Sequence, residues 1–155
     1  MAARKRDSRD IWDAAGDLPD RYCKVAELER MIRSRSAPRR LLALLIMNVQ
    51  SVARRKPKSY LRLARQMIED SDNTCRWQAL SVVAQFIEDR PDEVWEVVKE
   101  YGDHEDEDMR MGVACVVLEH LLEHHWSKHY RKAKRLAARS PLFADTLDTC
   151  WDFRE

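Results

Sequence analysis

Apolar positions in the middle of the chain recur at helical spacing and, over a longer distance, every 34 residues. One stripe with the spacing i, i+3, i+4, i+7 consists of Leu80, Val83, Ala84 and Ile87. The positions 34 residues later are Ala114, Val117, Leu118 and Leu121. This spacing is typical of one face of an amphipathic helix. Each stripe follows an acid, Asp72 or Asp106, which suits the positive end of a helix. The pattern predicts two similar helices from a repeating unit.

A second helix follows the first one in each unit, with the same offset of 34 residues. One such helix carries Pro57, Tyr60, Leu63, Ala64 and Met67, and its counterpart carries Pro91, Val94, Val97, Val98 and Tyr101. Proline fits the first turn of a helix, where its missing N–H is not needed. The apolar pattern continues into a third, looser pair that ends near residue 137, with a connection expected around Trp126 and Ser127. The apolar residues of segments 20–35 and 140–151 indicate a capping helix at each end of the repeat.

The openings Asp72-x-x-Cys75-Arg76 and Asp106-x-x-Met109-Arg110 resemble the start of HEAT repeats. The resemblance, to the HEAT/armadillo-like helical repeat family, covers about residues 38–139. It implies an all-α fold, a short α-α superhelix of about three HEAT-like helix pairs with N- and C-terminal capping helices. It also implies that acid and arginine side chains lock adjacent repeats, through Asp72, Arg76, Asp106 and Arg110.

Composition agrees with a helical chain, because there are only three glycines and five prolines in 155 residues. Residues 1–10 are too charged to pack, so we expect 1–19 to be a flexible or partly ordered segment and 20–155 to be a single HEAT-like domain. The basic start is not followed by an apolar segment of the signal-peptide type. The apolar run 41–47 is too short to span a membrane. A cytoplasmic location is therefore expected.

Candidate chemistry is sparse. The four cysteines are far apart and lack the C-x-x-C spacing, which favours reduced, buried thiols. The run His120-x-x-Glu123-His124 matches the inverted zinc-protease pattern, and His125 and His129 form a second pair one turn apart. Such a zinc site needs a third ligand from another element, and the sequence offers no evident donor. We therefore predict no metal and no cofactor, although chelation of added nickel or zinc by His125 and His129 would be unsurprising.

The chain shows neither a nucleophile elbow, nor a Cys/His signature, nor a glycine-rich phosphate loop, so a non-catalytic role is favoured over an enzyme. Charge is distributed unevenly: the net charge is +10 for residues 1–65, −12 for 66–125 and +3 for 126–155. By resemblance the second helices line the concave binding face, which would then run positive, negative, positive. The expected partner-binding residues are Arg62, Arg65, Trp95, Glu96, Arg131 and Arg135. Trp95 stands one residue off its apolar stripe, and both a buried ring and a partner-contacting ring remain open.

The leading hypothesis is a protein–protein interaction or scaffold module that binds a protein or peptide of mixed charge. The alternative is a DNA-binding HEAT-like protein related to DNA alkylation repair glycosylases, but an acidic middle helix would repel phosphates. A separate nucleic-acid patch in the basic first 65 residues stays open, with Arg39, Arg40, Arg54, Arg55 and Lys56 as candidates. Self-association of the basic front with the acidic middle is a third possibility.

Overall fold

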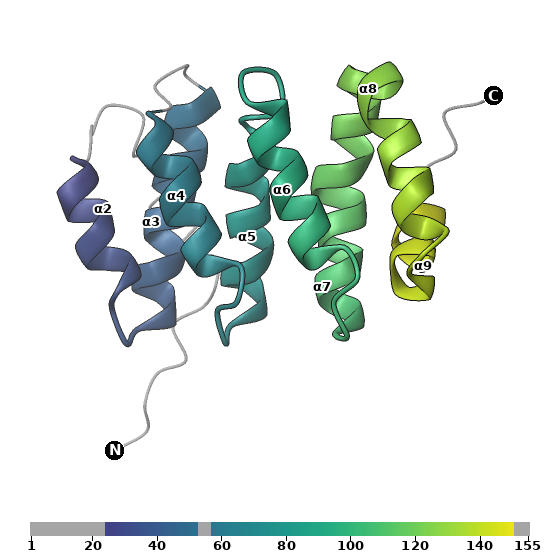
Figure 1. Cartoon of the computed structure of the whole chain (residues 1–155). Coiled ribbons are helices and arrows are strands. Elements are labelled where there is room, and N and C mark those ends of the chain that lie inside the picture. Colours follow the sequence, from purple (N-terminus) through teal and green to yellow (C-terminus); the bar gives the residue numbers. More distant parts are fainter. Residues whose placement is uncertain (1–23, 53–56, 151–155) are drawn as a thin grey trace.

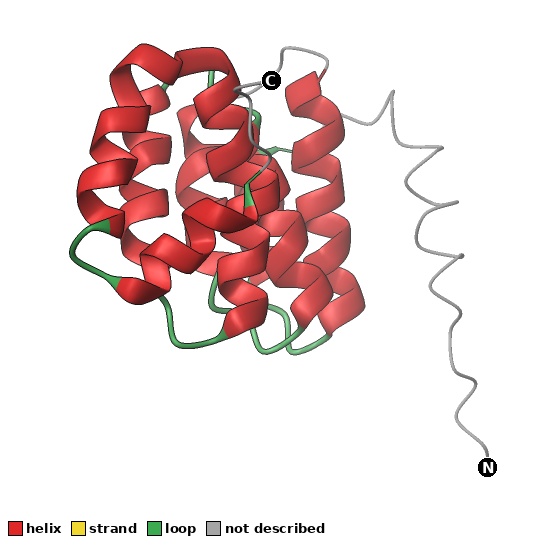
Figure 2. Cartoon of the chain, turned by 90° about the vertical axis from the view of Figure 1, so that its right-hand side faces the viewer, coloured by secondary structure: helices red, strands yellow, loops and turns green. Residues whose placement is uncertain are grey.

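A computed structural model describes residues 24–52 and 57–150, and helices joined by short loops make up this part of the chain (Figures 1 and 2). The helices are α2 (Val25–Ile32), α3 (Ala37–Val52), α4 (Lys58–Met67), α5 (Asn73–Ala84), α6 (Pro91–Tyr101), α7 (Glu107–Gly112), the π-helix η1 (Val113–Leu118), α8 (Glu119–Ala137) and α9 (Pro141–Thr149). Because α7, η1 and α8 follow one another without a break, they count as one helical rod. The described ranges thus hold seven helical rods and no strand. The predicted all-α class is confirmed there.

The rods lie in two layers (Figure 1). Helices α2, α4 and α6 form the layer nearest the viewer, and α3, α5 and the α7–η1 rod lie behind them. Across the layers α2 contacts α3, α4 contacts α5, α6 contacts η1, and α8 contacts α9. Along the rear layer α3 contacts α5, α5 contacts η1, and η1 contacts α9. Each rod thus packs on its neighbours in the row.

Helix starts follow the capping residues that the sequence shows. The Asp72 side chain accepts a hydrogen bond from the Cys75 N–H at 3.0 Å, and the Asp106 side chain accepts one from the Asp108 N–H at 3.0 Å. Ser140 caps α9 by accepting from the Phe143 N–H at 3.2 Å. These bonds satisfy N–H groups that have no partner inside the helix. The predicted starts at residues 72 and 106 are confirmed.

The predicted stripes form the core. On α5 and η1 the side chains of Leu80, Val83, Ala114 and Val117 are at most 1% exposed. The second-helix residues Tyr60, Leu63, Ala64, Val94, Val97 and Val98 are equally buried. The core is therefore one continuous band between the two layers, closed at the α9 end by Phe143.

The connection expected near Trp126 is a kink rather than a loop. His125 has non-helical backbone angles, φ −137° and ψ 41°, inside α8. Its Nε2–H donates to the Ile87 carbonyl at 2.9 Å, which ties the kink to the segment after α5. The kink lets α8 begin in the rear layer and return toward the viewer. The predicted segment 1–19, Cys23 and the Trp151 part of the C-terminal cap lie outside the described residues.

Three arginine–aspartate bridges connect successive rods of the rear layer. Arg40 of α3 holds Asp70 at 2.7 and 2.8 Å, and Arg76 of α5 holds Asp106 at 2.8 Å. Arg110 of α7 holds Asp145 of α9 at 3.0 Å. The first two bridges reach the start of the next rod, and the third reaches the middle of α9.

Three of the four residues expected to lock repeats, Arg76, Asp106 and Arg110, take part in these bridges. Asp72 caps α5, and Asp70 is the acid that binds Arg40. Burial alone would raise the pKa of Asp70, but the hydrogen bonds and charge of Arg40 hold it below its ordinary value. The Arg76 hydrogen bond likewise lowers the pKa of Asp106.

Within the described part of the chain, no helix is both long and apolar enough to cross a membrane.

Candidate partner-binding surfaces

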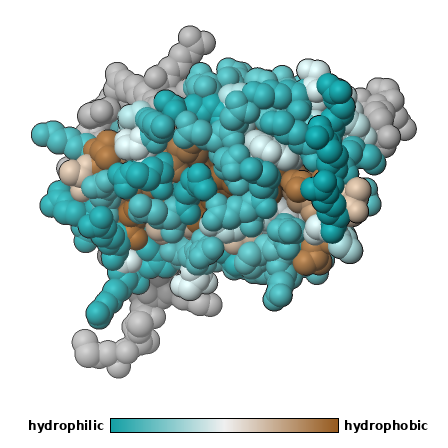
Figure 3. All heavy atoms as spheres, in the orientation of Figure 1, coloured by the Kyte–Doolittle hydropathy of each residue, from teal (hydrophilic) through white to brown (hydrophobic). Residues whose placement is uncertain are grey.

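The front face formed by α4, α6 and the end of α8 is largely hydrophilic (Figure 3). Its charges pair across neighbouring helices. Arg62 binds Glu29 of α2, Arg65 binds Glu100 at 2.8 Å, Lys58 approaches Glu93 at 3.6 Å, and Lys128 binds Asp92 at 2.8 Å. Exposed pairs of this kind contribute little stability, at most about 1 kcal/mol each. They nevertheless neutralise much of the predicted positive, negative, positive pattern.

The expected partner-binding residues do not form one site. Arg62 and Arg65 line a hollow of about 280 Å³ between α4 and α6. Glu96 binds Lys99 on its own helix at 2.7 Å. Arg131 and Arg135 are exposed on α8, and neither forms an ion pair with any described residue. The structure thus brings only the first two of these residues together.

Trp95 adopts the buried alternative, because its side chain is only 5% exposed. Helix α8 packs on this side of α6 and covers the ring. The Trp95 and His129 ring centroids are 5.4 Å apart, and Lys132 Nζ lies 5.9 Å from the Trp95 ring centroid. Trp95 is therefore part of the α6–α8 packing and cannot act as an exposed anchor in this conformation.

His129 is the one fully buried histidine among the described residues, at 0% exposure. Neither ring nitrogen has a hydrogen-bond partner in the described part of the chain. Burial, followed by the charges of Lys132 and Lys128, lowers its pKa to about 4, against a weaker opposite effect of Asp92. The ring is consequently neutral at pH 7.

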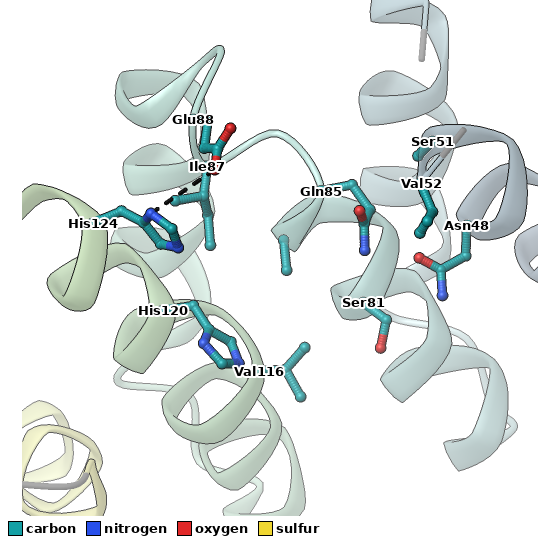
Figure 4. A pocket seen from close by; sticks show the side chains of 11 residues that line it. Asn48, Ser51, Val52, Ser81, Gln85, Ile87, Glu88, Val116, His120 and His124 are labelled. Atoms are coloured by element: carbon teal, nitrogen blue, oxygen red, sulfur yellow. Dashed lines mark ion pairs between the residues drawn. The ribbon is translucent and has the colours of Figure 1, made fainter. Parts of the chain in front are cut away.

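The rear face carries a larger hollow, about 600 Å³, across the ends of α3 and α5 and the start of α8 (Figure 4). We call it the rear groove. Its lining is mostly uncharged and polar, and it consists of Asn48, Ser51, Val52, Ser81, Ala84, Gln85, Ile87, Glu88, Val116, His120 and His124. Glu88 is the only carboxylate among these lining residues. The groove therefore offers amide, hydroxyl and imidazole groups beside four apolar side chains.

The hydrogen-bonding capacity of this lining is only partly used. The Ser51 hydroxyl donates to the Met47 carbonyl at 2.7 Å, and the Ser81 hydroxyl donates to the Trp77 carbonyl at 3.1 Å. Both hydroxyl oxygens keep lone pairs that can accept. The Asn48 Oδ1 atom is buried and has no hydrogen-bond partner within the described ranges. The walls can therefore accept further hydrogen bonds from a bound molecule.

The π-helix η1 sets the register of the third wall. Gln85 follows the bridging Arg76 by nine residues, whereas His120 follows the bridging Arg110 by ten. A π-helix accommodates an extra residue in a turn, and such insertions are frequent at functional sites. Because η1 absorbs the extra position, Gln85 and His120 both line the rear groove.

The metal pattern of the sequence also lies here. His120 Nδ1 is 3.3 Å from Glu123 Oε2, and His124 Nδ1 is 4.0 Å from Glu88 Oε1. Among the described residues, no group of three His, Cys, Asp or Glu side chains is placed to hold a metal ion. The pattern contributes two imidazoles to the groove.

Sequence reasoning missed Asn48, Ser81 and Gln85, because single uncharged polar residues on an apolar helix carry no motif. Comparison of the chain with family models, curated proteins and solved structures gives no match.

Proposed function

We propose that the chain is a non-catalytic scaffold of the HEAT type whose rear groove binds an extended segment of a partner protein. The repeat interpretation is supported by the arginine–aspartate bridges. Two of them, Arg40 to Asp70 and Arg76 to Asp106, each span 30 residues and join equivalent rods. The row of contacts from α3 through α5 and η1 to α9 supports the same interpretation.

The size of the rear groove suits a short peptide segment. Packed helices lie about 8–10 Å apart, so a groove across three of them is roughly 20 Å long. An extended chain advances about 3.3–3.6 Å per residue, and roughly six residues would fill this length. The volume of about 600 Å³ is in the range of ordinary ligand sites.

The chemistry of the lining favours main-chain groups. Carboxamide, hydroxyl and imidazole groups exchange hydrogen bonds with peptide N–H and C=O groups, whereas phosphates need cations. Glu88 and the absence of Lys and Arg among the described lining residues disfavour an anionic ligand.

The observation that carries the proposal is the buried Asn48 Oδ1 without a partner. A buried acceptor left unsatisfied costs about 1–3 kcal/mol. An N–H donor of a bound segment would remove this cost once the Asn48 side chain turns its buried Oδ1 atom into the groove.

The front face is a weaker candidate, as is the DNA-repair alternative that depends on it. A DNA-binding face needs an uninterrupted basic track. Lys58, Arg62, Arg65 and Lys128 are each paired with a carboxylate there.

The proposal can be tested by display selection with random peptides of about ten residues against the full chain. Selected peptides should bind Asn48→Ala/His120→Ala at least about tenfold more weakly, since two polar contacts of about 1 kcal/mol each are lost. The matched control Gln66→Ala/Arg131→Ala removes an amide and a charge from the front face and should bind like the wild type. Circular dichroism would verify that both variants fold.

A selection without enriched peptides would contradict the proposal. So would peptides that lose affinity only for the front-face variant.

A further inference from the structure

The segment 30–68 contains eleven lysines and arginines but neither aspartate nor glutamate. Residues 54–56, which hold three of these cations, lie outside the described residues. Four others are engaged by acids from elsewhere in the chain, and these are Arg40, Lys58, Arg62 and Arg65. The remaining four are Arg30, Arg33, Arg35 and Arg39, which we call the arginine corner. All are exposed.

The arginine corner surrounds a single turn. Arg30 lies in the last turn of α2, Arg33 is its C-cap, Arg35 is in the connection, and Arg39 lies in the first turn of α3. None of the four side chains forms a hydrogen bond or ion pair with any part of the chain that the structure describes. Four positive charges are thus concentrated at one end of the helix row.

The backbone of this turn is held in place by Arg40. Its guanidinium donates to the Ser34 carbonyl at 3.0 Å while it also binds Asp70. The Ser36 N–H donates to Ser34 Oγ at 3.2 Å. A fixed backbone presents the four arginines in a constant arrangement, which lowers the entropy lost when they bind.

The nearby acids that the structure describes do not neutralise the corner. Glu29 is paired with Arg62, Asp70 is paired with Arg40, and Asp72 caps α5. Glu27 belongs to the first turn of α2, at the opposite end of that helix from the corner.

We infer that the arginine corner binds the phosphate backbone of a double-stranded nucleic acid without reading its sequence. All four cations are arginines, whose planar forks match phosphate oxygens. The exposed large apolar residues of the described chain are Val49, Val52, Met111 and Leu142, and none belongs to the corner. A purely cationic patch without an apolar or aromatic anchor fits phosphate contacts better than membrane insertion or base stacking.

Salt dependence measures the number of phosphates involved. Four contacts on a duplex predict a slope of about −3.6 in log K against log salt concentration. The affinity of the full chain for a labelled 20-base-pair duplex should therefore fall about 150-fold between 25 and 100 mM salt. Fluorescence anisotropy at several salt concentrations gives the slope.

The decisive comparison uses two variants with the same change of net charge. Replacing Arg30, Arg33, Arg35 and Arg39 by Gln should weaken duplex binding at 25 mM salt at least about 100-fold and bring the slope close to zero. The control replaces four exposed cations of the C-terminal part, Arg131, Lys134, Arg135 and Arg139, by Gln, and should bind within about threefold of the wild type.

Absence of duplex binding by the wild type at 25 mM salt would overturn the inference. Equal losses in both variants would do the same, because binding would then follow net charge. Tighter binding to vesicles containing phosphatidylserine, or to polyglutamate, than to the duplex would show that the corner serves another anion. Asn48→Ala should leave duplex binding unchanged, so this test is independent of the rear groove.

Discussion

Replacement of His129 by leucine should stabilise the protein, and more so in acid. The imidazole is fully buried between α6 and α8, and both of its nitrogens lack a hydrogen-bond partner among the described residues. Leucine has a similar size and no polar atom. Removing the unsatisfied group should add about 1–3 kcal/mol to the free energy of unfolding at pH 7.5.

Acid adds a second contribution through proton linkage. The pKa of His129 is about 4 in the folded protein, against an ordinary value of 6.5. As the pH falls from 6.5 to 4, His129 therefore becomes protonated in the unfolded chain while it stays neutral in the folded chain. The wild type loses stability over this pH range. By pH 4.5 the loss from this one group is about 2.5 kcal/mol. His129→Leu abolishes it.

Urea unfolding followed by circular dichroism at pH 7.5, 6.0 and 4.5 gives both contributions. The difference in free energy of unfolding between His129→Leu and the wild type should increase by about 2.5 kcal/mol from pH 7.5 to pH 4.5. His120→Leu is the control on the same helix, because it removes an imidazole whose side chain is 51% exposed. A gap that does not change with pH, or a destabilised variant at pH 7.5, would refute the reasoning.

Three further outcomes are expected. Arg76→Met removes the bridge to the partly exposed Asp106 and should lower the midpoint of urea unfolding slightly. An unchanged midpoint would argue against a stabilising bridge. Gly102→Ala places a Cβ 2.5 Å from a backbone oxygen and 2.6 Å from the Phe143 ring. The free energy of unfolding should therefore fall by about 1–3 kcal/mol, and Tm by several degrees. An unchanged Tm would show that the neighbouring atoms can move aside. Burial raises the pKa of Cys75 to about 12, so iodoacetamide should label this thiol only when the chain unfolds. Peptide mass mapping would locate the label. Rapid labelling of Cys75 in the folded chain would contradict its burial.

The helical class and the core could be predicted from sequence because they depend on local signals. Capping acids at residues 72 and 106 and apolar stripes with helical spacing specify where helices begin and which side they bury. The fate of Trp95 could not be predicted in this way. Its burial depends on the path of α8 across α6, which follows from the kink at His125.

The Arg40–Asp70 bridge could not be predicted from the Asp-x-x-x-Arg motif either. Ser36 stands four residues before Arg40, whereas aspartates stand four residues before Arg76 and Arg110, so the Asp-x-x-x-Arg signature is absent at Arg40. The partner acid, Asp70, lies two residues before the capping Asp72 and belongs to the loop between α4 and α5. Only the spatial arrangement of α3 and α5 reveals that Arg40 plays the role of Arg76 and Arg110.

The rear groove was missed for a related reason. Asn48, Ser81 and Gln85 are each a single uncharged polar residue among apolar ones. The sequence pattern of His120 and His124 indicated only possible metal ligands. The groove becomes visible only when the rods are placed side by side and η1 brings His120 into register with Gln85.

Nuclear magnetic resonance titration of the labelled full chain with a selected peptide would test the central claim most directly. The account predicts that the Asn48 side-chain amide signals shift at the lowest peptide concentrations, together with backbone amides at the ends of α3 and α5 and the start of α8. Shifts confined to α4 and α6, with the Asn48 side chain unchanged, would contradict it.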